Sequence, residues 1–322
     1  MVIHLITIVE YLILAILTVF LSIHLSQCVD IMDKKSNLSG AFIGGVLLAA
    51  VTSLPELFTS LTAVLALDKP QLIQGNVLGS NIFNLTIYAL TVLFFTKSYR
   101  EAKIAKTQRS SLFFCIIMFL CVIFALFYQI EINFGFTQLH LMSLVILVIY
   151  LISTILIKGD NSVDNEDSDA TMTLRQASIR FVIFAVLLVI VSILLTQVTD
   201  QLSAQLNLGA TVAGAIFLGV ATSLPELSSS LSLAKLKNFN ASVANVVGSC
   251  VFNFTILSFA DLIYSKGGIY GYDKQALIFS IFGILSCILT VMGLHQKWSK
   301  NGLRMIACGI LVCYVASVVL SM

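Results

Sequence analysis

Ten apolar stretches run through this chain, and each is long enough to cross a lipid bilayer as a helix. A spanning helix needs about 20 mainly apolar residues, at 1.5 Å of rise per residue, to cross a hydrocarbon core of roughly 30 Å. In lipid, backbone polar groups must pair within the protein, and helices do this internally. We therefore expect an all-α integral membrane protein with ten transmembrane helices, near residues 5–27, 38–67, 71–96, 110–130, 137–157, 177–197, 209–236, 239–263, 274–295 and 303–321.

Composition excludes a soluble protein and gives no sign of a nucleic-acid partner. Of the 322 residues, 58% are hydrophobic and 11% are charged, whereas soluble domains carry about 25% charged residues. The formal net charge of +2 leaves no basic excess for nucleic acid. Residues 5–27 lack the features of a cleaved secretory signal, so we expect them in the mature protein. The expected partners are the lipid bilayer and a small solute, and no obligate protein partner is implied.

The distribution of cationic residues predicts the orientation of the chain. Short loops rich in Lys and Arg stay in the cytoplasm. Fifteen of the eighteen Lys and Arg residues follow odd-numbered stretches, whereas Lys69, Lys266 and Lys274 lie on the other side. We therefore expect a multi-pass protein of the plasma (inner) membrane, with both termini outside and the central loop in the cytoplasm.

The central loop, residues 158–176, is hydrophilic and carries five acidic residues between Asp160 and Asp169. A Ca²⁺-binding loop that includes Asn165 would need Gly at its sixth position and Glu at its twelfth, where the chain has Ala170 and Gln176. We therefore interpret residues 158–176 as an acidic cytoplasmic linker.

An internal repeat divides the chain into two halves. Residues 52–57 and 222–227 both read Thr-Ser-Leu-Pro-Glu-Leu, and the match extends over signatures at 44–87 and 214–256. Each half holds five predicted spans, and an odd number inverts the second half relative to the first. We expect a first five-helix repeat at 1–157 and an inverted second one at 177–322. Halves of this kind, meeting around polar sites near the midplane, are typical of secondary transporters.

Two glutamates lie in the middle of predicted spans, at equivalent positions of the repeat. Glu56 and Glu226 each cost about 2.5 to 3.5 kcal/mol or more to place at the bilayer centre, so each is a functional-site candidate. Pro55 and Pro225 precede them and lack the N–H that a continuous helix would use. We therefore expect a helix break beside each carboxylate. No Lys or Arg lies in the core of a span to form a structural ion pair with them.

Hydroxyl and amide side chains recur around the glutamates. Asn76, Ser80 and Asn84 follow one another every fourth residue, as do Asn245, Ser249 and Asn253. Oxygen ligands of this kind suit Ca²⁺, Na⁺ or Mg²⁺ rather than zinc or copper. Close helix packing is the competing interpretation for the small residues, including the Gly75 to Gly79 G-x-x-x-G, and interhelical hydrogen bonding is favoured for Asn76 and Asn245. The seven cysteines lack a C-x-x-C pair and are interpreted as packing residues.

These residues resemble the two alpha-repeats of the sodium/calcium exchanger family, within the Ca²⁺:cation antiporter superfamily. The resemblance rests on Thr52–Glu56 with the run from Gly75 to Asn84, and on the second copies at 222–226 and 244–253. It implies a ten-helix inverted-repeat exchanger without a cofactor, in which Glu56 and Glu226 are the central Ca²⁺ ligands. By the same resemblance, Thr52 and Thr222 add backbone oxygens, Asn84 and Asn253 line the centre, and Ser53, Ser80, Ser223 and Ser249 help form flanking Na⁺ sites.

The chain departs from the family pattern at three positions. Many relatives carry Asp where this chain has Asn253, which argues against K⁺ co-transport and leaves two titratable core groups. Ala244 and Cys250 stand where the pattern prefers Gly and Asn. The last two differences can alter the Na⁺ sites or the coupling ion.

The resulting prediction is a secondary antiporter, not an enzyme, that exchanges cytoplasmic Ca²⁺ for external Na⁺ by alternating access. The resemblance implies three Na⁺ per Ca²⁺ and hence electrogenic transport. The alternative on the same fold is an antiporter of Ca²⁺, or another divalent cation, with H⁺, because buried glutamates can become neutral by protonation. A cation channel is less favoured, since channels use symmetric rings around an open pore. An intramembrane hydrolase would need a base beside Ser53 or Ser223, and no His is near either residue in the sequence.

Overall fold

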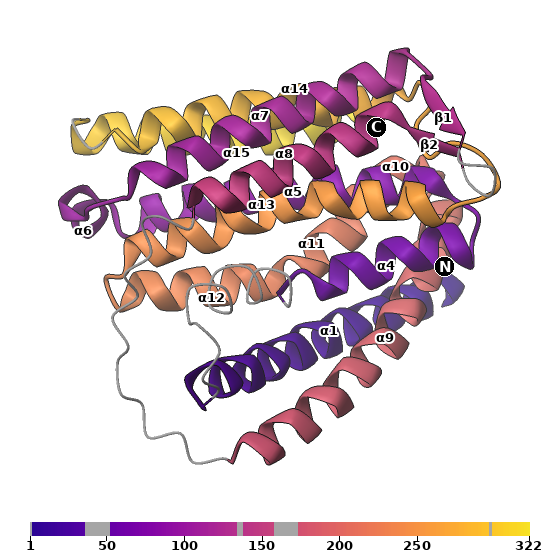
Figure 1. Ribbon diagram of the computed structural model, residues 1–322, viewed down its shortest axis with the longest axis horizontal. Coiled ribbons are helices and arrows are strands. Elements are labelled where there is room, and N and C mark those ends of the chain that lie inside the picture. Colours follow the sequence, from indigo (N-terminus) through magenta and orange to yellow (C-terminus); the bar gives the residue numbers. More distant parts are fainter. Residues whose placement is uncertain (1, 36–51, 134–137, 158–172, 296–297) are drawn as a thin grey trace.

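A computed structural model describes residues 2–35, 52–133, 138–157, 173–295 and 298–322. These residues form a bundle of helices and one small hairpin (Figure 1). The helices are α1 (Val2–Lys35), α4 (Leu54–Leu65), α5 (Pro70–Phe94), α6 (Thr96–Glu101), α7 (Lys106–Phe127), α8 (Leu141–Ile157), α9 (Leu174–Gln205), α10 (Ala210–Ala213), the π-helix η2 (Gly214–Leu218), α11 (Gly219–Thr222), α12 (Leu224–Lys235), α13 (Phe239–Ile263), α14 (Lys274–Gly293) and α15 (Lys300–Ser321).

Each of the ten predicted stretches contains helix. Among the described residues, seven helices, α1, α5, α7, α9, α13, α14 and α15, are long and apolar enough to cross a membrane, and the bent series α10 to α12 makes an eighth when it is counted as one span. The other two stretches correspond to the shorter apolar helices α4 and α8. Residues 36–51, where the second stretch begins, lie outside the described residues, as does most of the central linker. The chain is therefore a multi-pass, all-α membrane protein, with span length shown for eight of its ten stretches.

The predicted helix break is present in the seventh stretch. The helix ends at Thr222, Ser223 forms a turn, and α12 restarts with Pro225 in its first turn, so that the two pieces are bent by 44°. Pro is tolerated in a first turn because the N–H there has no partner within the helix. The first half shows the same local arrangement, because α4 begins at Leu54 directly after a turn at Ser53.

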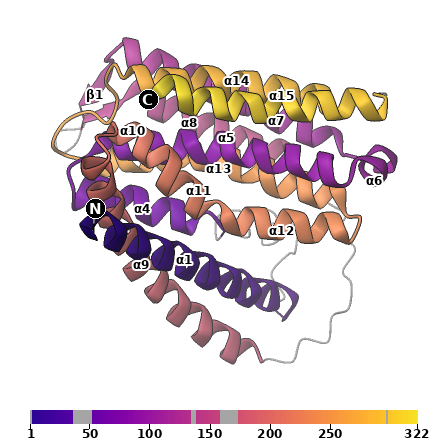
Figure 2. The ribbon, with the colours of Figure 1, turned by 180° about the vertical axis from the view of Figure 1, so that it is seen from behind.

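Two helices form the interior of the bundle. In the most apolar 18-residue segment of each helix, the buried share is 78% for α5 and 72% for α13, compared with 28% for α1 and for α9. Figures 1 and 2 show α1 and α9 side by side at one edge of the bundle, while α14 and α15 lie at the opposite edge. The apolar side chains of α1 and α9 therefore face outward, where lipid would cover them, while α5 and α13 carry their polar residues into the protein.

A small hairpin, which the sequence did not predict, lies outside the spans. Strands β1 (Glu131–Asn133) and β2 (Gln138–His140) pair antiparallel, with Glu131 opposite His140, so the fifth helix begins at Leu141 rather than near residue 137. The backbone N–H of His140 donates to the Asp261 carboxylate at 2.8 Å. This hydrogen bond connects the hairpin to the end of α13.

Candidate functional site

The two predicted glutamates lie at the start of short helices, one in each half. Glu56 is in the first turn of α4 and Glu226 is in the first turn of α12, and both are completely buried. The partial positive charge of a helix N-terminus favours a carboxylate at this place. The ion pairs found among the described residues, Lys69–Asp200 and Lys266–Asp68, do not include either glutamate. Neither carboxylate therefore has a cationic side chain as partner in that part of the chain.

Each glutamate faces the helix break of the opposite half. Ser223 Oγ donates to Glu56 Oε1 at 3.1 Å, and Thr222 lies beside the same carboxylate. Thr52 and Ser53 lie beside Glu226 in the corresponding way. The two carboxylates are close enough to interact electrostatically. The repeated hexapeptides thus meet across the interface between the halves.

Polar residues of α5 and α13 support the two glutamate-bearing helices. Asn76 Nδ2 donates to the Glu56 carbonyl at 3.2 Å and to Ser60 Oγ at 2.9 Å. Asn245 Nδ2 donates to the Glu226 carbonyl at 3.4 Å and to Ser230 Oγ at 3.0 Å. These contacts match the interhelical hydrogen bonding expected for both asparagines. Their role is to fix the start of each short helix.

Residues Ser80 and Ser249 take different partners. Ser80 Oγ donates to the Gly219 carbonyl at 3.2 Å, whereas Ser249 Oγ donates to Glu226 Oε1 at 3.4 Å. Thr222 Oγ1 donates to the Leu218 carbonyl at the end of η2, and the resemblance assigns the backbone oxygen of Thr222 to the site. All of these side chains are buried.

Asparagines from both halves meet where α5 and α13 pass each other. Asn253 Nδ2 donates to Asn81 Oδ1 at 3.1 Å, and Asn84 lies beside Cys250. Asn81 is not among the predicted site residues, because it lies outside the four-residue stripe of Asn76, Ser80 and Asn84. Its position corresponds to Cys250 in the repeat, and this correspondence is the signal that could have identified it.

Several buried oxygens at this place have no hydrogen-bond partner among the described residues. They are Glu56 Oε2, Glu226 Oε2, Asn84 Oδ1 and Asn253 Oδ1, and all four side chains are completely buried. Buried polar atoms without partners need an explanation, and a cation is one that a cluster of such oxygens fits. Two carboxylates and several neutral oxygens carry a formal charge of about −2, which a hard cation would neutralise. No cluster of three or more His, Cys, Asp or Glu side chains accompanies them in the described part of the chain.

Glycines allow the interior helix α5 to approach the broken span closely. A Cβ atom on Gly75 would lie 2.0 Å from the Thr211 carbonyl oxygen, and one on Gly79 would lie 2.4 Å from Ala215 Cα. On the facing segment, a Cβ on Gly214 would lie 2.4 Å from the Leu72 carbonyl oxygen. The two backbones are therefore in direct contact, as small-residue packing predicts. This contact sets the position of Ser80 and the other polar residues of α5.

A separate polar network lies at the end of the molecule that carries the hairpin. Asp261 is almost completely buried, and its Oδ2 accepts hydrogen bonds from Ser143 Oγ at 2.7 Å and from the His140 N–H.

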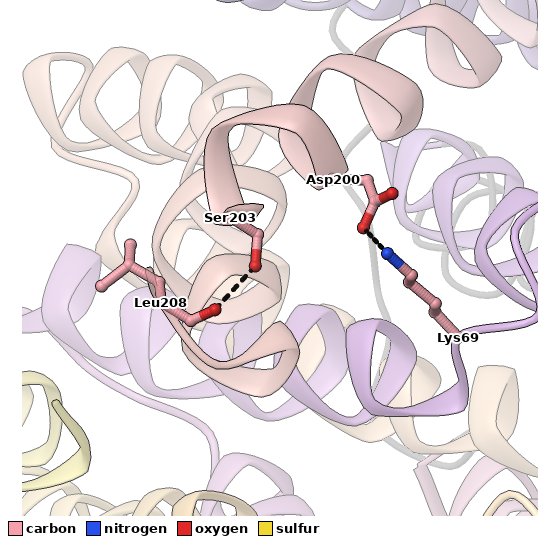
Figure 3. A network of polar contacts seen from close by, with 4 residues as sticks. All are labelled: Lys69, Asp200, Ser203 and Leu208. Atoms are coloured by element: carbon pink, nitrogen blue, oxygen red, sulfur yellow. Dashed lines mark hydrogen bonds and ion pairs between the residues drawn. The ribbon is translucent and has the colours of Figure 1, made fainter. Parts of the chain in front are cut away.

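Near the end of α9, Lys69 and Asp200 point toward each other and form an ion pair, and Ser203 Oγ donates to the Leu208 carbonyl (Figure 3). These groups join loops and helix ends and lie outside the proposed ion site.

Comparison with known proteins gives a consistent family match. A family model described as "Sodium/calcium exchanger protein" matches residues 7–158 and 177–322. An uncharacterized membrane protein of Methanocaldococcus jannaschii is 28% identical over 275 residues, which are 84% of this chain and 83% of that protein. The match therefore spans nearly the whole chain and leaves out most of the central linker.

Solved structures share the architecture. The H⁺/Ca²⁺ exchanger CAX has a TM-score of 0.74 at 13% identity, over 98% of this chain and 86% of that one. The sodium-calcium exchanger NCX_Mj, soaked with 10 mM Na⁺ and zero Ca²⁺, has a TM-score of 0.60 at 20% identity, over 99% of both chains. Native YfkE has a TM-score of 0.67 at 13% identity, over 97% of this chain and 91% of that one. At these identities the likeness concerns the fold, and it confirms the expected exchanger architecture.

Proposed function

We propose that this chain, which belongs to the sodium/calcium exchanger family, is a secondary active antiporter that exchanges Ca²⁺ for Na⁺ by alternating access. The observation that carries the proposal is the pair of buried glutamates, one from each half, that lie within electrostatic range of each other and each have an unpartnered carboxylate oxygen. Such a pair lacks a protein counter-charge among the described residues. A cation taken from either side of the membrane supplies that charge.

The proposed ligand set is the one that the family resemblance implies, and the burial of these residues supports it. Glu56 and Glu226 bind Ca²⁺, and the unpartnered amide oxygens of Asn84 and Asn253 complete the centre. The backbone carbonyls of Thr52 and Thr222 add neutral oxygens beside the breaks. The hydroxyls of Ser53, Ser80, Ser223 and Ser249 form the flanking Na⁺ sites.

Competition for the same two carboxylates is the proposed basis of coupling. A site with two negative charges and no cation is too costly to move through a low-dielectric barrier. The protein therefore changes conformation when Ca²⁺ or several Na⁺ ions have neutralised the site. Replacement of one Ca²⁺ by three Na⁺ would change the charge of the loaded site from about 0 to about +1, so transport would be electrogenic.

Coupling to H⁺ is the second candidate. The unpartnered Oε2 atoms of Glu56 and Glu226 are each able to carry a proton, and two protons would neutralise the site as one divalent cation does. The proteins that share this fold include one whose name states Na⁺ exchange and one whose name states H⁺ exchange. The distinction therefore needs a direct measurement.

The orientation is proposed from the charge distribution. Loops rich in Lys and Arg, with the linker 158–176, lie in the cytoplasm, and both termini lie outside. The pseudo-two-fold axis then relates the halves 1–157 and 177–322 within the membrane plane. Two fusions test this orientation with a reporter enzyme that is active only outside the cell. The reporter should be active when it is fused to the C-terminus and inactive when it is inserted in the central linker.

The decisive experiment is ⁴⁵Ca²⁺ uptake into proteoliposomes with an imposed Na⁺ gradient, compared with uptake under a pH gradient alone. We expect uptake to follow the Na⁺ gradient and to be lost in Glu56→Gln and Glu226→Gln. Glu101→Gln, a matched change at an exposed residue of α6, should retain uptake. Uptake that follows pH and ignores Na⁺ would reject the first candidate in favour of the second. Uptake unchanged in both core variants would reject the site.

A further inference from the structure

A buried carboxylate outside the ion site joins three separate segments at the hairpin end of the bundle. Asp261, near the end of α13, is 1% exposed. Its Oδ2 accepts hydrogen bonds from the His140 N–H at 2.8 Å and from Ser143 Oγ at 2.7 Å. The Ile269 backbone lies beside the same carboxylate. Asp261 therefore connects the hairpin, the start of α8 and the loop 264–273, which links α13 to α14.

The loop 264–273 also contacts the interior helix that carries part of the ion site. Gln74 Nε2, on α5, donates to the Ile269 carbonyl at 2.6 Å. Ile269 and Tyr270 are both buried, so this part of the loop belongs to the packed interior. Gln74 directly precedes Gly75, where the backbone of α5 contacts the broken span. A displacement of the loop would therefore act on the end of α5 whose close packing positions its site residues.

The charged and titratable groups around Asp261 come from the hairpin, the loop and α7. His140 and Tyr270 interact with the carboxylate directly, and their rings are 4.9 Å apart. The other groups on these elements lie one step further away: Cys121 of α7 lies beside Tyr270, Glu131 is opposite His140 in the hairpin, and Tyr264 and Lys266 pair with Asp68. No Lys or Arg interacts with Asp261 in the described part of the chain.

The carboxylate of Asp261 has room for a proton. Its Oδ1 atom has no hydrogen-bond partner among the described residues, although the side chain is buried. A proton on Oδ1 removes the negative charge of the group. Hydrogen bonds to a charged acceptor are about twice as strong as those between neutral groups. Protonation would therefore weaken the bonds that the His140 N–H and Ser143 Oγ donate to Oδ2.

The ring of His140 offers a second place for a proton. Its Nδ1 accepts a hydrogen bond from the Met142 N–H at 3.0 Å, and its Nε2 lies 2.8 Å from the Tyr128 carbonyl oxygen. These contacts assign the ring hydrogen to Nε2, since the nearby Ile130 N–H also has the Tyr128 carbonyl as acceptor at 3.1 Å. A second proton, on Nδ1, would meet the Met142 N–H and break that hydrogen bond. A proton at either place thus loosens the hairpin.

We propose that Asp261 and His140 form a proton-binding site, separate from the ion site, and that a proton bound there loosens the hairpin and the loop 264–273 and slows ion exchange. The two groups titrate as a pair, because they interact directly. The proton stays in this site and is not the coupling ion. The effect on exchange rests on the proposed function, whereas the loosening does not. In the proposed orientation, this end of the bundle lies outside the cell, so the site would respond to external pH.

The first measurement does not depend on transport. Hydrogen–deuterium exchange of peptides from residues 138–143 and 264–273 is recorded for the full-length protein in detergent, between about pH 8 and pH 5, where histidine ordinarily changes charge. Rates are corrected for the intrinsic pH dependence of exchange. We expect protection of both segments to fall by about 2- to 10-fold on acidification, as for the loss of one hydrogen bond.

Two variants separate the contributions of the pair. Asp261→Asn resembles the neutral acid, so its protection should be low at every pH. His140→Asn keeps an oxygen acceptor near the position of Nδ1 and cannot titrate. It should retain protection at about pH 8 and lose part of the pH dependence. Asp273→Asn is the matched control, because Asp273 caps α14 after the same loop and Asn is an equally good N-cap.

The second measurement is ⁴⁵Ca²⁺ uptake into proteoliposomes under the Na⁺ gradient. The pH is the same on both sides, so that no pH gradient drives uptake. Each protein is compared with its own uptake at about pH 8. On this scale, wild-type uptake at about pH 5 should be about 2- to 10-fold lower than that of Asp261→Asn. Protonation of Glu56 and Glu226 affects both proteins and therefore cancels in the comparison. Asp273→Asn should follow the wild type in both measurements.

The outcomes separate this inference from the proposed function. Protection that is independent of pH in the wild type, or that depends on pH equally in both variants, would overturn the proton site even if Na⁺ drives Ca²⁺ uptake. The same acid dependence of uptake in all proteins would overturn its role in exchange. Protection whose pH dependence needs Asp261 and His140, in a protein without Na⁺-driven uptake, would reject the proposed function and retain the proton site. If Asp261→Asn does not fold, His140→Asn provides the test, because it preserves the backbone N–H that Asp261 bonds.

Discussion

At the scale of single residues, Asn76 shows how a polar side chain can be structural inside an ion site. Its Nδ2 atom contacts the Glu56 carbonyl, Thr59 Oγ1 at 2.9 Å and Ser60 Oγ, so one amide group holds the first two turns of α4. We predict that Asn76→Ala lowers the free energy of unfolding by about 1–3 kcal/mol, because it leaves buried groups without partners. The measurement is thermal unfolding of the purified protein in detergent.

Thr86→Ala is the control for Asn76→Ala, since Thr86 Oγ1 donates to Ile82 within the same helix α5. Asn245→Ala should have a smaller effect than Asn76→Ala, because Asn245 is less buried and its hydrogen bond to the Glu226 carbonyl is longer. Equal melting temperatures for Asn76→Ala and Thr86→Ala would contradict the interhelical role.

We predict that Asp68 makes the stability of the protein depend on pH. Outside the spans, the hydrogen bond that Tyr264 donates to Asp68, at 2.6 Å, and the nearby Lys266 ammonium lower the pKa of the Asp68 carboxyl. The pKa of Tyr264 is raised by the same bond. Because the pKa of Asp68 is lower in the folded state, its contribution to stability is present above its unfolded pKa of about 3.9 and is lost as pH falls through the folded value.

Tyr264→Phe removes this hydrogen bond and should therefore lower the melting temperature at neutral pH. The difference between the variant and the wild type should stay constant from roughly pH 8 to pH 5 and become smaller below about pH 4. Asp68→Asn should reduce the same acid dependence. A difference that grows as pH falls would contradict the assigned sign.

At the scale of elements, the contact between α5 and the broken seventh span depends on the absence of side chains. A Cβ atom on Gly79 would meet Ala215 Cα at 2.4 Å and Ala215 Cβ at 2.7 Å, so the backbones would have to separate. We predict that Gly79→Ala lowers the free energy of unfolding by about 1–3 kcal/mol, the usual cost of overpacking. It should also reduce Ca²⁺ uptake, because Ser80 moves with the helix.

Gly271→Ala is the matched control, because a Cβ atom there meets no other atom within 4 Å. Both variants are assayed for melting temperature and for uptake in proteoliposomes. If Gly79→Ala behaves like Gly271→Ala, then close backbone packing does not position α5.

The elements that could be predicted from the sequence are those set by length and apolar character. The long apolar runs identified α5 and α13 to within about two residues at each end, and Pro225 correctly indicated the break before α12. The π-helix η2 was missed because no local pattern in the sequence signals it, although it begins at Gly214, which packs against Leu72. The hairpin β1–β2 was missed because each strand has only three residues, and β2 is held by Asp261, a residue distant in sequence.

At the scale of the whole molecule, the repeat predicted which residues meet across the two halves, but not the detailed pairs. The equivalent hexapeptides meet, because Ser223 of the second donates to Glu56 of the first. The pairing of Asn81 with Asn253 could not be predicted, because it depends on the rotation of α5 relative to α13. Asp261 lies near the end of α13, yet it is buried because the hairpin and α8 cover it. Burial of this kind is a property of the assembled bundle.

An ion pair joins the two halves at one end of the bundle. Lys69, in the turn after α4, pairs with Asp200 of α9, and both side chains are partly exposed. We predict that Lys69→Asp and Asp200→Lys each destabilise the protein by about 1 kcal/mol or less, the range of exposed ion pairs, and that the double exchange restores most of the loss. Melting temperatures of the four proteins, at low and high salt, provide the measurement. Lys266→Asp, at a pair that is more exposed, should have a smaller effect. Because attraction between the two charges is the physical reason for the restored stability, salt should reduce every difference. A double exchange as unstable as the single variants would show that shape, and not charge, joins the halves at this place.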